Sequence, residues 1–235
     1  MNISLVIPAY NEEKYIGRCL ESVEKYGAGL SEVIVINNAS TDRTGEIART
    51  FSNVRVIDEL KKGRPFARDR GSQEARGDFL AYIDADCVLP PDWVSQITAG
   101  VARDPRVICL SGPYRYYDLP PISNFFAQLG WWLSAPITYR IAGYALLAGN
   151  FVAKKDVFMK IGGFNDEVLF YGDDTDLGRR LSAHGKVRFD MDFFVYTSGR
   201  RLLESGLFKT FFLYGLNFIW EAVFKRPFSK STGNE

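Results

Sequence analysis

Two acidic residues near the middle of the chain, Asp84 and Asp86, could hold a cation. They lie at the end of the apolar segment 78–84 and just beyond it. Unpaired charges at the end of a buried strand are costly, and a divalent cation removes that cost. Hard cations such as Mg²⁺ and Mn²⁺ prefer carboxylate, water and phosphate oxygens. The chain contains no glycine-rich phosphate loop of the dinucleotide or Walker type. We therefore expect a metal-held diphosphate rather than one bound by backbone amides.

Polar residues also follow two earlier apolar segments. Tyr10 and Asn11 come after the segment 3–8, and Asn37 and Asn38 end or follow the segment 32–37. In an open α/β sheet, ligands bind outside the carboxyl ends of the strands. These residues should therefore meet the acidic pair at one edge of a sheet.

The elements that must position these residues alternate along the first 110 residues. Apolar, β-rich segments predict strands at 3–8, 32–37, 54–57, 78–84 and 106–110. Amphipathic segments predict helices starting at Asn11 and at about 41–51, 64–76 and 91–102. Strands buried on both faces that alternate with helices imply parallel pairing and right-handed crossovers. The predicted fold class is α/β, with a doubly wound, mostly parallel central sheet and helices on both faces.

Composition sets the outer limits. The chain has 235 residues, of which 46% are hydrophobic, which suits one large domain or one domain with an appendage. Its formal net charge of +1 gives no general electrostatic reason to bind a nucleic acid polymer. Three cysteines cannot all pair, and the first residues lack the pattern of a signal peptide. We expect a cytoplasmic protein.

Four ordered motifs carry a family resemblance. The segments SLVIPAYNEE, VINNASTD, GRPFARDRGSQEARGDFLAYIDAD and IGGFNDEVLFYGDDTDLGRRL resemble the family 2 glycosyltransferases of GT-A fold, over residues 2 to about 184. The resemblance implies a metal-dependent, inverting transfer of one sugar from a nucleotide-diphosphate sugar, usually UDP-linked in this family, to a hydroxyl acceptor. Processive members carry a Gln-X-X-Arg-Trp motif, which this sequence lacks. That absence favours transfer of a single sugar over polymerisation.

The resemblance assigns the donor site. It implies that Pro8 and Tyr10 lie at the nucleotide, with Tyr10 as the platform for the base, and that Arg68 faces the nucleotide. Asn38 stands where the family has an acidic residue that hydrogen-bonds the base. An amide both donates and accepts, so the identity of the base is open. The alternatives are a tyrosine that only lines a turn and an arginine on a solvated helix face.

The resemblance also assigns the metal ligands and the base. Asp86 would ligate Mg²⁺ or Mn²⁺ directly, and Asp84 would contact the ribose or a metal-bound water. In the segment 172–177, Asp174 would be the general base, flanked by Asp173, where the family has glutamate, and by Asp176. Alternatively, these acidic residues cap the helix that begins near 174.

The second half of the chain contains an aromatic insert and a tail with basic flanks. We expect a catalytic domain over 1–198, divided into a nucleotide-sugar-binding half (1–110) and an acceptor and base half (111–198) with an aromatic insert at 121–148. Pro136 and Arg140 within the insert argue against a membrane span. Residues 199–235 predict an amphipathic helix with basic flanks. It either packs on the domain or lies on an anionic membrane at the inner face of the cell membrane. The acceptor would be a glycan or a lipid-linked molecule, as in envelope polysaccharide biosynthesis, and Arg200 and Arg201 are candidates to bind a diphosphate or an anionic acceptor.

Two other functions remain open at this point. One is a sugar nucleotidyltransferase on a similar sheet, although such enzymes usually have a basic, glycine-rich segment after the first strand, and VIPAYNEEKY does not resemble it. The other is a catalytically degenerate binding or membrane-scaffold protein. The asparagine pair and Asp173 keep that alternative open.

Overall fold

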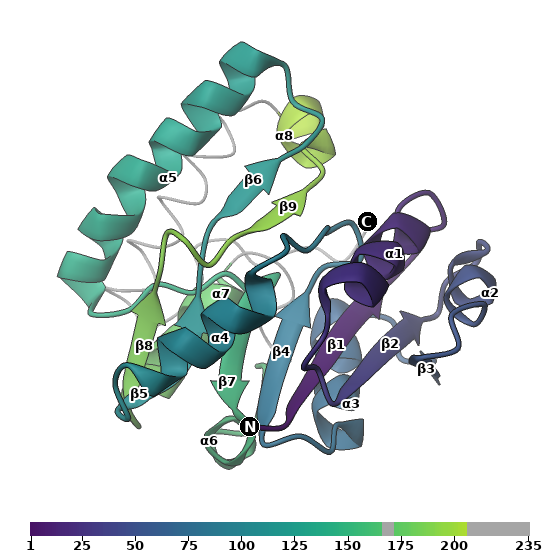
Figure 1. Cartoon of the computed structure of the whole chain (residues 1–235), viewed down its shortest axis with the longest axis horizontal. Coiled ribbons are helices and arrows are strands. Elements are labelled where there is room, and N and C mark those ends of the chain that lie inside the picture. The colour runs from purple at the N-terminus through teal and green to yellow at the C-terminus, as the bar shows by residue number, and fades with distance from the viewer. Residues whose placement is uncertain (166–171, 206–235) are drawn as a thin grey trace.

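The computed structural model describes residues 1–165 and 172–205. Its centre is a seven-stranded sheet in the order β3-β2-β1-β4-β7-β5-β8 (Figure 1). The strands are β1 (Ile3–Ala9), β2 (Glu32–Asn38), β3 (Val54–Glu59), β4 (Phe79–Ile83), β5 (Val107–Ser111), β7 (Asn150–Lys154) and β8 (Lys186–Phe189). Strands β3, β2, β1 and β4 are parallel, as are β5 and β8. The predicted α/β class with a mostly parallel sheet is confirmed.

Strand β7 is one of the strands that were not predicted from the sequence. It lies between β4 and β5 and is antiparallel to both. Its first residue, Asn150, pairs with Ile83, the last residue of β4. Because the two strands run in opposite directions, the segment that precedes β7 reaches the carboxyl end of β4. Residues 148 and 149 therefore lie beside the acidic pair.

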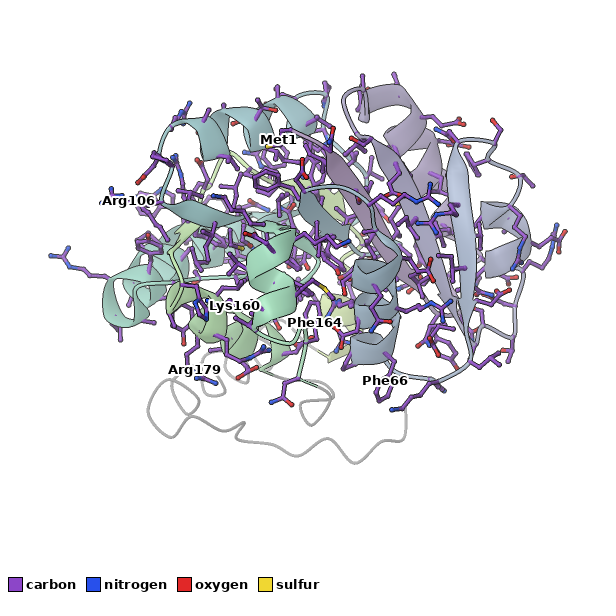
Figure 2. All side chains as sticks on the ribbon, turned by 90° about the horizontal axis from the view of Figure 1, so that it is seen from below. Met1, Phe66, Arg106, Lys160, Phe164 and Arg179 are labelled. Atoms are coloured by element: carbon purple, nitrogen blue, oxygen red, sulfur yellow. The ribbon has the colours of Figure 1, made fainter. Side chains whose placement is uncertain are left out.

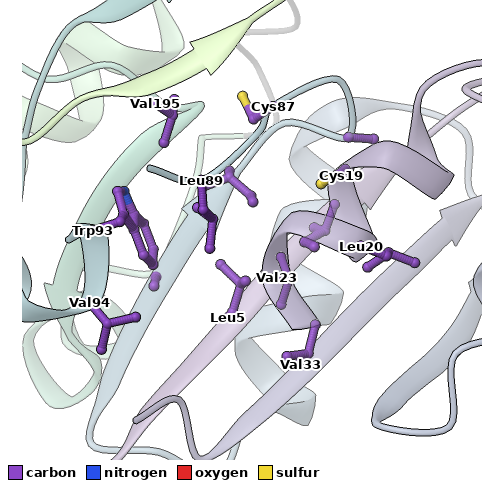
Figure 3. Packing of buried hydrophobic residues seen from close by; sticks show 14 of the residues in the cluster. Leu5, Cys19, Leu20, Val23, Val33, Cys87, Leu89, Trp93, Val94 and Val195 are labelled. Carbon is purple, nitrogen blue, oxygen red and sulfur yellow. The ribbon is translucent and has the colours of Figure 1, made fainter. Parts of the chain in front are cut away.

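Helices cover both faces of the sheet. Alternate residues of β1 point to opposite sides, with Leu5 and Ile7 in one core cluster and Val6 in the other. Helices α1 (Ile16–Tyr26) and α4 (Trp93–Ala102) complete the first cluster, which Figure 3 shows around Leu5, Leu20 and Trp93. Helices α3 (Arg64–Glu74), α6 (Lys155–Lys160) and α7 (Asp173–Ser182) complete the second. Helices therefore cover both faces of the sheet, and a functional site is expected at the ends of the strands.

Two helices start later than predicted. Helix α1 begins at Ile16 instead of Asn11, and the helix predicted over 41–51 is reduced to α2 (Thr44–Ala48). Asn11 has φ 53°, in the left-handed region that asparagine tolerates better than most residues. Its side-chain oxygen accepts a hydrogen bond from the Thr41 backbone N–H at 2.8 Å. The segment after β1 and the segment after β2 are thus hydrogen-bonded to each other, and neither is part of the helix that follows it.

A smaller unit lies beyond the carboxyl end of the sheet. Strands β6 (Tyr114–Tyr116) and β9 (Val195–Thr197) pair in parallel, and α5 (Pro121–Ala142) runs beside them (Figure 1). Pro136 lies inside α5 without ending it. None of the described helices combines the length and hydropathy needed to cross a membrane. Helix α8 (Arg200–Ser205) follows β9, and the predicted tail helix beyond Ser205 falls outside the described residues.

Candidate active site at the carboxyl edge of the sheet

The polar segments that follow β1 and β2 meet as expected. Besides the bond from Thr41, the Asn11 backbone N–H donates to Ser40 Oγ at 3.1 Å. Among the described residues, Asn11 and Ala39 are the two non-glycine residues with positive φ, 53° and 54°. Each lies one or two residues beyond the end of its strand. Local strain of this kind persists only where neighbouring contacts impose it, and it is common at functional sites.

The predicted base platform, Tyr10, is accessible. The residue is 37% exposed, and the Lys62 ammonium lies 4.3 Å from the ring centroid. Pro8 is the sixth residue of β1 and is partly buried. The rim of the site at this end is therefore an aromatic face with a lysine over it.

Asn38, in contrast, is buried and its amide is already used. The Nδ2 group donates to the backbone carbonyls of Glu59 and Lys61, and Oδ1 accepts from the Gly63 N–H. These bonds hold the segment that joins β3 to α3. In this structure Asn38 positions that segment, which carries Lys62 above Tyr10.

Arg68 is buried, with 1% of its side chain exposed, so it does not lie on a solvated helix face. Its guanidinium donates to Asp173 at 2.7 Å and to Asp84 at 3.3 Å. The Phe164 ring, labelled in Figure 2, packs against the guanidinium, with its centroid 5.0 Å from Cζ. One arginine thus joins the acidic pair that follows β4 to the acidic motif of α7.

The late acidic motif forms the first turn of α7. Gly172 precedes the helix with φ 105°, a conformation that glycine adopts without strain. Negative side chains are favoured in the first turn by the positive end of the helix dipole. The three aspartates nevertheless face different partners. Asp173 binds Arg68, whereas Asp176 accepts from Arg179 and Arg180 at 2.6 Å each and so stabilises the helix itself.

Asp174 is held just before the start of β7, and its pKa is raised. Its Oδ2 accepts a hydrogen bond from the Ala148 N–H at 3.4 Å. Burial and the neighbouring negative charge of Asp173 raise the pKa of Asp174 well above its ordinary value. Burial alone would also raise the pKa of Asp173, but its hydrogen bond with Asp174 and the charges of Arg64 and Arg68 lower it instead. The pair therefore separates into one firmly ionised carboxylate and one that takes up a proton readily.

The second residue of the acidic pair, Asp86, contacts side chains from β9 and from the residue that starts α8. Thr197 Oγ1 donates to Asp86 Oδ1 at 3.2 Å, and Arg200 Nη2 lies 3.5 Å from Asp86 Oδ2. Arg200 also pairs with Glu12. Glu12 and Thr197 were not identified from the sequence, because nothing in their spacing marks them as neighbours of Asp86.

Asp84 has close neighbours from β6 and from the segment before β7. Tyr114 Oη donates to Asp84 Oδ2 at 3.5 Å, and burial raises the pKa of Tyr114 well above its ordinary value. A Cβ atom on Gly149 would lie 2.3 Å from Asp84 Oδ2 and 2.2 Å from Tyr114 Oη. The backbone at Gly149 therefore approaches the carboxylate as closely as only glycine permits.

These oxygens suit a divalent cation that is shared with a ligand. The part of the chain that the structure describes holds no cluster of three or more histidine, cysteine, aspartate or glutamate residues able to enclose a metal. Mg²⁺ is usually held by one or two carboxylates, with waters and substrate phosphates completing its shell. Asp84 and Asp86 provide two such carboxylates, and Glu12 Oε2 nearby is a buried oxygen without a hydrogen-bond partner. The donor set fits Mg²⁺ or Mn²⁺ bound together with phosphate oxygens.

Comparison with known proteins is consistent with this geometry. The sequence model of the family described as "Glycosyl transferase family 2" matches residues 4–161. The curated "Probable glycosyltransferase YdaM" of Bacillus subtilis is 28% identical over 204 residues, which is 80% of this chain and 48% of that protein. The chain spans between a third and about half of the length of the first curated relatives that it matches.

Several solved structures share the fold, among them the two that follow. A mannosyltransferase from Pyrobaculum calidifontis, in complex with GDP-Man and Mn²⁺, matches with a TM-score of 0.66 at 19% identity, over 84% of this chain and 56% of that one. Glucosyl-3-phosphoglycerate synthase from Mycobacterium tuberculosis, in complex with Mn²⁺, UDP and glucosyl-3-phosphoglycerate, matches with a TM-score of 0.66 at 21% identity, over 94% and 79%. At such identities the likeness establishes the fold, which is GT-A-like.

Proposed function

The chain belongs to glycosyltransferase family 2, and from that premise we propose that it transfers one sugar, with inversion, from a nucleotide-diphosphate sugar to a hydroxyl acceptor. The observation that carries the proposal is the position of Arg68 between Asp84 and Asp173. Arg68 and Asp173 are 105 positions apart in the sequence, yet they are hydrogen-bonded. Arg68 belongs to the predicted donor site, and Asp173 lies beside the predicted base, so this contact brings the two sites together. A transferase needs this arrangement, because both substrates must meet.

Each residue of the site has a role that its surroundings support. The exposed ring of Tyr10 would stack on the nucleotide base, near Pro8, while Asn38 would hold the segment above it. Asp86, with Asp84 directly or through a water, would hold Mg²⁺ or Mn²⁺. When bound, such a cation supplies positive charge that neutralises the departing diphosphate.

Asp174 would act as the general base. Its raised pKa suits that role, because a base works best when its pKa lies near the operating pH. Asp173 would position it, since its carboxylate is fixed by Arg68 and bonds to Asp174. Deprotonation of the acceptor hydroxyl by Asp174 as that hydroxyl attacks the anomeric carbon gives a single displacement, and hence a β-glycoside from an α-linked donor.

We further propose that helix α5 faces an anionic membrane surface and brings the enzyme to a lipid-linked or membrane-proximal acceptor. Seven of its large apolar side chains are exposed: Ile122, Phe125, Phe126, Trp132, Leu133, Ile137 and Ile141. Arg140 is the one charged residue in the helix. An apolar surface with aromatic side chains and no acidic residue matches what an anionic lipid interface accepts.

The experiment that tests the proposed transfer is release of nucleoside diphosphate from a panel of nucleotide sugars in Mn²⁺. Slow release is expected for the wild type and should be lost in Asp86→Ala, which removes the predicted metal ligand. Asp174→Asn should still bind donor but transfer no sugar, because the base is gone while the metal ligands remain. Asp192→Asn, an exposed aspartate on the loop between β8 and β9, is the control and should match the wild type.

Three results would contradict the proposal. Release that is unaffected by Asp86→Ala would exclude the metal site. Formation of a nucleotide sugar from a sugar phosphate and a nucleoside triphosphate would indicate the nucleotidyltransferase alternative. Donor binding without any turnover would indicate a degenerate binding protein.

A further inference from the structure

Arg200, the first residue of α8, joins two carboxylates that come from different strand ends. Its guanidinium pairs with Glu12, which follows β1, and lies 3.5 Å from Asp86 Oδ2, which follows β4. The Tyr15 ring supports it from the side, with its centroid 4.3 Å from Cζ. The arginine side chain is 24% exposed, so it remains accessible from solvent.

Two carboxylates share the guanidinium of Arg200. The carboxylates of Glu12 and Asp86 are 13% and 9% exposed, and both contact the same Nη2 atom. The second oxygen of Glu12 has no hydrogen-bond partner. Two largely desolvated negative charges thus share one guanidinium, and this is the kind of oxygen-rich position that a divalent cation also favours. Arg200 and a cation would compete for Asp86.

A diphosphate offers Arg200 a new partner. The guanidinium is a planar fork that binds phosphate oxygens with two parallel hydrogen bonds, as it does carboxylates. Arg68, which also lies beside the acidic pair, is not free to do this, because it is buried and holds Asp84 and Asp173. Arg200 is partly exposed and has only to release one carboxylate.

We propose that Arg200 exchanges partners during donor binding: it pairs with Asp86 and Glu12 in the free protein, and binds the diphosphate once a cation has taken Asp86. The inference rests on the proposed function, because it requires a nucleotide diphosphate at the acidic pair. It has a consequence that a purely structural role lacks. Removing the arginine strengthens binding of the cation alone and weakens binding of the diphosphate.

The test uses Arg200→Gln and two binding measurements that involve no turnover. Mn²⁺ alone is titrated against the protein and followed by the electron paramagnetic resonance signal of free Mn²⁺. UDP and GDP are then titrated calorimetrically in saturating Mg²⁺. The variant should bind Mn²⁺ roughly three- to tenfold more tightly than the wild type, since Asp86 has lost a competing partner. It should bind the nucleotide about tenfold more weakly, since a charge-assisted contact is lost.

Two further variants sharpen the result. Arg200→Lys keeps the charge without the fork, so its nucleotide affinity should fall between those of the wild type and Arg200→Gln. Arg106→Gln removes an exposed arginine that precedes β5 at the outer edge of the molecule, labelled in Figure 2, and should change neither affinity. Circular dichroism and urea unfolding show whether each variant is folded.

Other outcomes would overturn the inference. Affinities for Mn²⁺ and nucleotide that both stay within about twofold of the wild type would mean that Arg200 contacts neither. Loss of both affinities in a folded variant would mean that the arginine only holds Asp86 in place. If the wild type itself binds neither UDP nor GDP, the proposed function fails first and the inference with it.

Discussion

Arg68 donates a hydrogen bond to Asp173 at 2.7 Å and joins α3 to α7 across 105 residues of sequence. Both side chains are almost fully buried, at 1% and 5% exposed. The same guanidinium reaches Asp84. A buried charge that loses its partner is strongly destabilising, so this arginine couples the stability of the fold to the integrity of the site.

Replacing Arg68 should therefore destabilise the protein. Arg68→Gln leaves Asp173 and Asp84 without their shared cation, and we expect the free energy of unfolding to fall by about 3–5 kcal/mol. Urea denaturation at neutral pH measures it. The loss should shrink in acid, where the two carboxylates can become neutral.

Arg70→Gln is the matched control in the same helix. Arg70 is 40% exposed and its partner Glu74 is 31% exposed, so this variant should lose no more than about 1 kcal/mol. Equal losses in the two variants would show that the buried pairing contributes nothing special.

The acid limb of the pH profile should report Asp174. As a base it must be ionised, so kcat/KM for transfer should rise with pH through its raised pKa, and the limb should lie well above pH 3.8, the ordinary value. Asp173→Asn removes the neighbouring negative charge and should move the limb to lower pH. A limb that stays in place in this variant would contradict the assignment.

Asp174 should lower the free energy of unfolding as the pH rises, whereas activity should rise with pH. A carboxyl group whose pKa is raised in the folded state is protonated more easily there than in the unfolded chain. Its contribution to stability is therefore complete below pH 3.8 and is lost as the pH rises through the folded-state pKa. Asp174→Asn, which stays neutral, should therefore be more stable than the wild type at neutral pH and no more stable near pH 3. Urea denaturation at both pH values measures the difference, and equal stability of the two proteins throughout would refute it.

Gly149 should be intolerant of a methyl group. In Gly149→Ala the new Cβ would lie 2.3 Å from Asp84 Oδ2, so the carboxylate must move and transfer should fall by about ten- to a hundredfold. Gly17→Ala in α1 is the control, because its Cβ would meet nothing closer than 3.7 Å. It should keep full activity and gain about 0.5–1 kcal/mol of stability. Initial rates and urea unfolding of the two variants distinguish these outcomes, and full activity in Gly149→Ala would show that Asp84 need not stay where it is.

Tyr10 should contribute to binding of the base and not of the diphosphate. Tyr10→Ala should weaken UDP or GDP binding by about 1–3 kcal/mol, the usual cost of losing one base–aromatic stack. Tyr10→Phe keeps the ring and should bind as the wild type does. Calorimetry in saturating Mg²⁺ measures both variants, and a similar loss in Tyr10→Phe would point to the hydroxyl group instead of the ring.

Helix α5 should bind anionic vesicles. We expect the wild type to float with liposomes that contain anionic lipid at low salt, and the triple variant Phe125→Ser, Trp132→Ser, Ile141→Ser to stay at the bottom. Leu60→Ser, which removes an apolar side chain that is 86% exposed after β3, is the control and should float. A wild type that does not float would exclude the membrane proposal.

Local sequence patterns were enough to predict the class of fold and the order of the segments that carry the site residues. The five predicted strands are present, because apolar segments of strand length flanked by turn residues have few other stable conformations. The start of α1 was predicted five residues too early, because Asn11 is bound by the segment after β2, and such a contact is invisible to local pattern.

Which of these residues are in contact is known only from the folded arrangement of the strands. Insertion of β7 between β4 and β5 brings Gly149 against Asp84, and the segment after β9 brings Arg200 to Asp86 and Glu12. Pairing of distant charges depends on the spatial order of strands, and strand order is set by packing of the whole sheet rather than by any local run of residues. The chemistry of a motif can therefore be predicted from the sequence, whereas the residues that contact the motif are known only from the folded structure.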